Sequence, residues 1–377
     1  MVNLKMIFRK LSQRCAILFV VFATSIAWMS AGRLGQAAQP ANEGNEIVYS
    51  SFGAIERLDP AIDKLIPAGA KIEKLAAGFD WSEGPVWVRI PLPGAEVVNP
   101  KHPDPRQGYL LFSDIPPNRI MKWAPTLKSA VIFMEPAGYS GTTERGGEPG
   151  TNGLTIDRES HLVMCDHGDR QIARLEKDGK KRSLVKEYQG KRLNSPNDLC
   201  YHSNGDLYFT DPPYGLVKGW DDPARELDFC GVYRLSPTGE VTLLTKELAR
   251  PNGICLSPDE TSLYVAQSDP AKAVLMAYQL QKDGKLGEGK VLFDATPLVK
   301  AGKKGLPDGL KVDKDGNIFL TGPGGVLILD PAGKHLGTIA TGEATANVAW
   351  GDDGSTLYIT ADMYLARVKT STRGAGW

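Results

Sequence analysis

A short pattern that recurs five times along this 377-residue chain constrains its fold more than any other feature. Each copy has a small polar or amide residue, an alternating apolar stretch, a turn rich in Asp, Asn and Gly, and a second apolar stretch. Asn-Gly and Asp-Gly turns favour tight β-hairpins because these residues tolerate positive φ. The copies start 39 to 56 residues apart, at Thr151, Pro196, Pro251, Pro307 and Ala346.

This spacing is typical of β-propeller blades, each of which needs four short strands. A sixth, more divergent unit starts at residues 80–87. We therefore predict an all-β, six-bladed β-propeller with four-stranded antiparallel blades. An N-terminal strand at residues 71–76 is expected to close the last blade. The long, uneven repeats argue against the alternatives, an open β-solenoid or a sandwich.

The first 37 residues have the order of a secretory signal peptide. A basic stretch runs from Lys5 to Arg14, an uncharged apolar run covers residues 15–31, and small residues follow. A retained transmembrane anchor is the alternative, because the apolar run is close to the shortest length that spans a bilayer. Either reading places the globular part outside the cytoplasm, in the periplasm or secreted. After cleavage no membrane association is expected.

These features divide the chain into three parts. Residues 1–37 are the predicted signal peptide, residues 38–70 an N-terminal extension with a short helix near 60–66, and residues 71–377 the propeller. The 44 basic and 44 acidic residues balance over the whole chain, but the first 37 residues hold five basic and no acidic ones. The remainder is therefore net acidic and carries no basic stripe, which excludes nucleic acid as a partner.

Propeller symmetry places repeat-equivalent residues in a circle at the mouth of the central channel. All six of these positions are carboxylates or amides: Glu83, Asn152, Asn197, Asn252, Asp308 and Asn347. Such oxygen ligands suit Ca²⁺, and the absence of His and Cys from the ring disfavours zinc and copper. The alternative is that they form turns through local backbone hydrogen bonds, an even choice for Asn152 and Asn347.

Several motifs resemble the senescence-marker-protein/gluconolactonase/luciferin-regenerating-like family. They are Trp-Ser-Glu-Gly-Pro-Val-Trp at 81–87, Ser-Asp-Ile-Pro-Pro-Asn-Arg-Ile at 113–120, Pro-Asn-Gly at 251–253 and Pro-Asp-Gly-Leu at 307–310. The resemblance runs from about residue 55 to the C-terminus. It implies a propeller that hydrolyses lactones with a divalent metal, often Ca²⁺. It also implies that Glu83, Asn252 and Asp308 bind the metal, with Asn197 as a further ligand or substrate contact.

Three more residues are candidates for chemistry or substrate contact. Asp198 follows Asn197 where Gly follows other ring residues, so it is either a base for the attacking water or a strand-edge Asp. His167 resembles the pocket histidine of the related paraoxonases, although a lone His is more often structural. Tyr214, in a Pro-Pro-Tyr-Gly loop, is expected to line the pocket or to pack within its loop. Asn152 and Asn197 are the other predicted substrate contacts.

These parts predict hydrolysis of a small-molecule lactone by metal-activated water attack, with Ca²⁺ or another divalent cation polarising the carbonyl. The base would be Asp198 or His167, and no Gly-x-Ser-x-Gly nucleophile motif occurs. Two other functions fit the same scaffold. One is a sugar- or ligand-binding propeller without turnover, and the other is an esterase or phosphoesterase.

Overall fold

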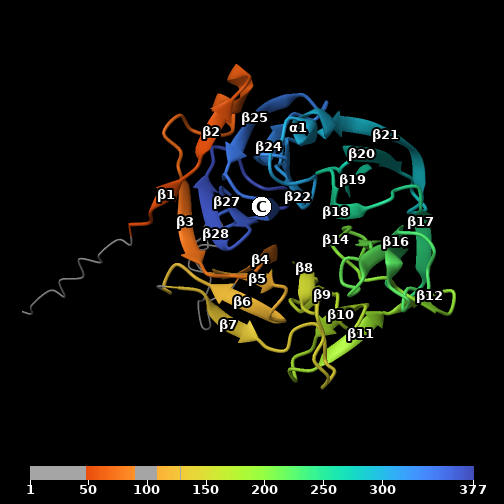
Figure 1. The fold of residues 1–377 in the computed structure, drawn as a ribbon. Coiled ribbons are helices and arrows are strands. Elements are labelled where there is room, and N and C mark those ends of the chain that lie inside the picture. Colours follow the sequence, from red (N-terminus) through yellow and green to blue (C-terminus); the bar gives the residue numbers. More distant parts are fainter. Residues whose placement is uncertain (1–47, 90–107, 128) are drawn as a thin grey trace, which may run out of the picture. The chain divides into compact units, whose positions relative to one another are not determined.

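Six antiparallel sheets follow one another along the chain and stand around a common centre (Figure 1). The computed structural model describes residues 48–89, 108–127 and 129–377. The six-bladed propeller predicted from the repeats is confirmed. The predicted signal peptide lies outside the described residues.

The first three blades each contain four strands in sequence order. Blade 1 holds β4 (Ser82–Arg89), β5 (Gly108–Asp114), β6 (Arg119–Trp123) and β7 (Val131–Met134). Blade 2 holds β8 (Thr151–Ile156), β9 (Leu162–Asp166), β10 (Gln171–Leu175) and β11 (Lys181–Val185). A two-stranded ribbon, β12 (Glu187–Tyr188) and β13 (Lys191–Arg192), follows along the chain. Blade 3 holds β14 (Leu199–Tyr201), β15 (Leu207–Asp211), β16 (Gly231–Leu235) and β17 (Val241–Thr245).

Of the last three blades, blades 5 and 6 also include strands from the N-terminal part of the chain. Blade 4 holds β18 (Pro251–Leu256), β19 (Ser262–Asp269), β20 (Lys272–Leu280) and β21 (Leu286–Asp294). Blade 5 holds β22 (Leu310–Val312), β23 (Ile318–Gly322), β24 (Gly325–Leu329) and β25 (His335–Ala340). Blade 6 holds β26 (Thr345–Gly351), β27 (Thr356–Ala361) and β28 (Tyr364–Lys369), and its fourth strand is β3 (Ile72–Ala77).

Strand β3 closes the ring, as the sequence predicted, by pairing antiparallel with β28. Two shorter strands precede it within the predicted extension. Strand β1 (Ser51–Phe52) pairs with the outer side of β3, and β2 (Ala54–Arg57) pairs with β25 of blade 5. The residues after β2 form a 3₁₀ helix, η1 (Pro60–Lys64), in which Asp59 accepts the N–H of Ala61 at 2.8 Å. The described part of the extension is thus built into two blades.

The core consists of apolar side chains that fill the space between neighbouring sheets. Its largest fully buried side chains are aromatic and include Trp123, Tyr208, Tyr233 and Tyr358. The few remaining helical turns are η2 (Gly219–Asp221) and α1 (Thr296–Lys300). No helix among the described residues is long and apolar enough to cross a membrane.

A β-bulge interrupts the innermost strand of four blades at its first residues. The register of β4 shifts after Glu83, and the registers of β8, β18 and β26 shift beside Asn152, Asn252 and Asn347. A bulge bends the strand and re-aims a side chain, so these polar residues leave the regular alternation. The bulges therefore position four of the six ring residues.

Glycines beside the ring residues allow neighbouring inner strands to approach closely. A Cβ on Gly84, whose φ is +49°, would lie 2.0 Å from the carbonyl oxygen of Asn152 in the next blade. A Cβ on Gly253 would lie 2.1 Å from the carbonyl oxygen of Asp308. Any larger residue would push these strands apart, which explains the recurring Gly after the ring position.

Candidate active site

Five of the six predicted ring residues line one cavity of 340 Å³. They come from five blades: Glu83 from β4, Asn152 from β8, Asn197 from before β14, Asn252 from β18 and Asp308 from before β22. The other lining residues are Trp81, Glu148, Tyr214, Ser268, Gly305, Leu306, Ala344 and Thr345. Ring closure has therefore gathered groups that are far apart in the sequence.

Several oxygen atoms in this cavity are buried and accept no hydrogen bond from the part of the chain that the structure describes. They are Oδ1 of Asn152, Oδ1 of Asn252 and Oδ1 of Asp308. A buried acceptor without a donor costs about 1–3 kcal/mol, so such groups are rare unless they have a ligand. These oxygens, together with the carboxylate of Glu83, fit a divalent cation of the Ca²⁺ type.

The amide of Asn252 is oriented by its neighbour Ser268. Its Nδ2 donates to Oγ of Ser268 at 2.8 Å, and this Oγ donates in turn to the carbonyl oxygen of Pro307 at 2.6 Å. The nitrogen side of the amide is thereby occupied and Oδ1 is left free. The same hydroxyl also touches the residue before Asp308, so it links two candidate ligands.

The carboxylates of the site raise one another's pKa. Burial raises the pKa of Glu83 to about 8, and the nearby charges of Asp198 and Glu148 contribute to the rise, although the N–H of Gly84 opposes it. Burial raises the pKa of Asp308 well above its usual range, and the charge of Glu83 adds to this. A bound cation would favour the ionised form of both carboxyl groups and so lower their pKa values, because it compensates the neighbouring negative charges.

The sixth ring residue, Asn347, does not line the cavity. Its Oδ1 accepts the N–H of Val348 at 2.9 Å, the local backbone contact that the sequence left open as an alternative. Asn152, for which the same alternative was open, has its oxygen free. The two amides look equivalent in the repeat but differ in their hydrogen bonds.

Both predicted bases lie behind the cavity wall. Asp198 is 2% exposed, and its Oδ1 accepts the N–H of Leu199 at 2.9 Å while its buried Oδ2 has no partner. His167 is completely buried and does not line the cavity. Its Nδ1 lies 3.2 Å from Oε2 of Glu148, without the alignment of a hydrogen bond. Tyr214, in contrast, lines the cavity as placed by the sequence.

A larger cavity of 560 Å³ lies elsewhere, between the hairpin turns of blades 2 and 3. It contains Asp157 and Glu159, which approach His161 closely enough to share a metal ion. However, Asp157 already accepts the backbone N–H of His161 at 2.7 Å and contacts its ring at 3.1 Å. These contacts account for the cluster as a hairpin turn, so the ring cavity remains the better candidate.

Residues 81–362 match the model of the SMP-30/Gluconolactonase/LRE-like region, which is most of the chain. The chain belongs to this family. The resemblance inferred from the sequence motifs is therefore confirmed, and the matched range includes all the ring residues.

Several proteins similar to this chain are lactone hydrolases by name. A gluconolactonase of Zymomonas mobilis is 36% identical over 97% of this chain and 99% of its own length. A lactonase, drp35, of Staphylococcus saprophyticus is 28% identical over 49% of this chain and 55% of its own length. A solved gluconolactonase of Xanthomonas campestris superposes with a TM-score of 0.69 at 28% identity and covers 85% of this chain and 97% of its own.

Trp81, Glu148 and Ser268 are among the cavity residues to which the sequence assigned no role. Trp81 could have been found, because it lies two residues before Glu83 in the motif that carries the resemblance. Ser268 is the second-last residue of a second strand, and hydroxyl residues hold the same position in four other blades: Ser113, Thr210, Thr321 and Thr360. The repeat therefore carried a signal for Ser268, although the sequence analysis considered only the first strand of each unit. Glu148 belongs to a loop outside the repeat, so no equivalent residue pointed to it.

Proposed function

We propose that this protein hydrolyses a sugar lactone, such as gluconolactone, with the help of one divalent cation, Ca²⁺ being the first candidate. The observation that carries the proposal is the convergence of unpartnered oxygens of Asn152, Asn252 and Asp308 on the cavity that Glu83 also lines. The extensive identity to a gluconolactonase supports the lactone as substrate.

In this proposal Glu83, Asn252 and Asp308 hold the cation, and Asn197 completes the protein ligands. A divalent cation in this position supplies a Lewis acid for a carbonyl oxygen. Asn152 and Tyr214 also line the cavity and would contact the substrate. Amide and hydroxyl groups of this kind can donate to and accept from the hydroxyls of a sugar ring.

The attacking water must lose a proton to a group of the protein. Asp198 and His167 stay the candidate acceptors, but neither lines the cavity. His167 would act through Glu148, whose carboxylate lies 3.2 Å from its Nδ1 and can accept a proton and pass it on. Asp198 would need a bridging water, because the amide of the adjacent Asn197 does not take up a proton. A group in such a position contributes about 10²- to 10⁴-fold to the rate when it acts as a general base.

Metal analysis and acid release from gluconolactone test this proposal together. The dialysed full-length protein should contain about one divalent ion per chain and release acid from gluconolactone faster than the buffer blank. EDTA should abolish the activity and added Ca²⁺ should restore it. A protein that binds the lactone but never accelerates its opening would instead be a binding propeller, and the proposal would fail.

The leader supports a second proposal, that the reaction takes place outside the cytoplasm. The order of basic, apolar and small residues in positions 1–37 is that of an export signal. The N-terminal sequence of the mature protein from its native host should begin between Gly32 and Gln39. An intact N-terminus on a soluble cytoplasmic protein would contradict this proposal and leave the enzymatic one untouched.

A further inference from the structure

Every charged residue that lines the cavity is an acid. Among the described lining residues these are Glu83, Glu148 and Asp308, and none is Lys, Arg or His. Glu83 and Asp308 belong to the proposed ligand set, so one divalent cation would balance their two charges. Glu148 is then left as a negative charge that no group of the lining compensates.

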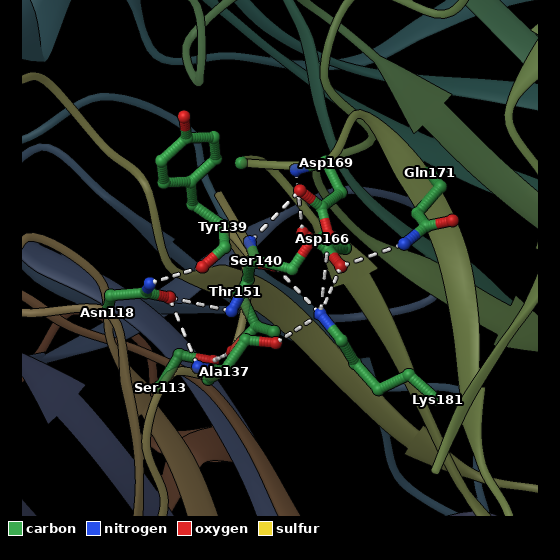
Figure 2. A network of polar contacts seen from close by, with 12 residues as sticks. Ser113, Asn118, Ala137, Tyr139, Ser140, Thr151, Asp166, Asp169, Gln171 and Lys181 are labelled. Atoms are coloured by element: carbon green, nitrogen blue, oxygen red, sulfur yellow. Dashed lines mark hydrogen bonds and ion pairs between the residues drawn. The ribbon is translucent and has the colours of Figure 1, made fainter. Parts of the chain in front are cut away.

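The loop that carries Glu148 is firmly anchored at its start, as Figure 2 shows. Lys181 donates to the carbonyl oxygens of Ala137 and Gly138 and to Oδ2 of Asp166, each at 2.8 Å. From the other side, Oδ1 of Asn118 accepts the N–H of Gly138 at 2.7 Å. The polar ends of Lys181 and Asn118 hold backbone atoms that would be bonded to water in a mobile loop.

The rest of the loop is fixed as well. Nη1 of Arg145 donates to the carbonyl oxygen of Gly168 at 2.9 Å, and Nη2 donates to that of Gly215. The N–H of Gly150 donates to the carbonyl oxygen of Ile115 at 3.1 Å. Glu148 therefore stands on a supported backbone, although 37% of its side chain is exposed at the mouth of the cavity.

A buried histidine, His167, lies beside the carboxylate of Glu148. Oε2 of Glu148 lies 3.2 Å from its Nδ1, and the ring itself is completely buried. Gly215 packs so closely on this ring that a Cβ there would lie 2.5 Å from Cβ of His167. The carboxylate thus has a buried polar neighbour and also lines the cavity.

We propose that Glu148 is the residue by which this site discriminates between lactones according to charge, admitting uncharged polyhydroxylated lactones and rejecting phosphorylated or carboxylated ones. The inference rests on the proposed lactone hydrolysis and assigns its substrate class. An uncharged sugar ring can donate hydroxyl hydrogens to the carboxylate. An anionic substituent gains no Lys, Arg or His partner among the described lining residues and is repelled by the carboxylate, which is how a site acquires selectivity against a competitor.

The test compares an uncharged ligand with its phosphate in both turnover and binding. Turnover is measured with gluconolactone and 6-phosphogluconolactone. Binding to the Ca²⁺-loaded full chain is measured by calorimetry with 1,5-anhydroglucitol and its 6-phosphate, which cannot be hydrolysed. The variants are Glu148→Gln and, as a matched control on the same loop, Glu144→Gln, an exposed acid that does not line the cavity.

The parent protein should prefer the uncharged member of each pair by about tenfold or more, and Glu148→Gln should reduce that preference at least severalfold. Glu144→Gln should leave it unchanged. Equal binding of both ligands by the parent, or an unaltered preference in Glu148→Gln, would overturn the inference even if gluconolactone is hydrolysed. Discrimination in binding by a parent protein without turnover would overturn the proposed function and leave this inference standing.

Discussion

At the scale of single residues, the site depends on which polar atoms are satisfied by the protein and which are left free. Ser268 accepts a hydrogen bond from the amide nitrogen of Asn252, which leaves the amide oxygen of Asn252 free for the cavity. The side-chain oxygen of Asn347 accepts a backbone N–H from its own strand, and the residue does not line the cavity. Residues outside the predicted ligand set therefore decide which ring residues can bind a cation.

We expect Ser268→Ala to weaken cation binding by about tenfold or more, because the loss of a partner behind a ligand typically costs 10- to 100-fold in affinity. Without the hydroxyl the amide of Asn252 can rotate, and the contact to Pro307 is lost as well. Calorimetric titration of the EDTA-treated protein with Ca²⁺ measures the effect. Ser257→Ala is the matched control, since this serine bonds to Asp259 in a hairpin turn. Equal affinities in both variants would contradict the assigned role.

A second residue-scale prediction concerns the buried pair of Lys181 and Asp166. Burial raises the pKa of Asp166 to about 6, and Lys181 restrains the rise. Because this folded-state pKa lies above the unfolded value of about 3.9, ionisation of Asp166 costs stability as the pH rises through that range. Lys181→Met should raise the pKa of Asp166 further. The free energy of unfolding that the variant loses relative to the parent should therefore grow from pH 5 to pH 8, where it should reach about 3 kcal/mol.

Urea denaturation at both pH values measures this loss. Lys180→Met is the control, because its side chain is 84% exposed and its ion pair with Asp178 is 3.8 Å long. A destabilisation of Lys181→Met that is the same at pH 5 and pH 8 would show that the charge of Asp166 does not matter.

At the scale of elements, the ring is held shut by a strand from the other end of the chain. Strand β3 supplies the outer strand of blade 6, and β1 and β2 extend blades 6 and 5. Ile72 of β3 is 2% exposed and belongs to the apolar cluster that contains residues of β26 and β27. Closure therefore rests on buried apolar contact as well as on strand pairing.

Ile72→Ala should destabilise the protein by about 2–5 kcal/mol, the usual cost of removing such a side chain from a core. Ile132→Ala, on the open edge strand β7 where the side chain is 48% exposed, should change the stability by no more than about 0.5 kcal/mol. Urea midpoints of the two variants give the comparison. Similar midpoints would mean that β3 does not hold the ring together.

At the scale of the whole molecule, binding of a cation and closure of the ring are linked. The proposed ligands Glu83, Asn252 and Asp308 lie in or before the inner strands of three different blades. An unfolded chain does not bring them together, so a cation binds the folded ring and stabilises it. Thermal stability therefore reports on the assembled site independently of any substrate.

The melting temperature of the parent protein should rise with Ca²⁺, by the equivalent of about 2.7 kcal/mol at a hundred times the dissociation constant. Asp308→Asn removes one charge at nearly constant volume and should lose most of this rise together with the activity. In EDTA the variant should melt no lower than the parent, because the repulsion from Glu83 disappears. An undiminished Ca²⁺-induced rise in Asp308→Asn would remove Asp308 from the ligand set.

The sequence alone determined the architecture and most of the ring. Repeat period and turn chemistry are local properties, and six units of this kind can bury their apolar faces only by stacking into a closed ring. The same repeat pointed to Glu83, Asn252 and Asp308 because equivalent positions in successive blades face one centre. The closing strand at residues 71–76 was predictable for the same reason.

Only the tertiary structure decided which of these groups are free to act. Asn152 and Asn347 are alike in the repeat, yet one oxygen is unpartnered and the other accepts a neighbouring N–H. Asp198 is adjacent to a ring residue but lies behind the wall, whereas Glu148 enters the cavity from a loop without any repeat. The physical reason is that hydrogen-bond partners and burial are set by the neighbouring blade and the loops above it, which ring closure brings together from distant parts of the chain.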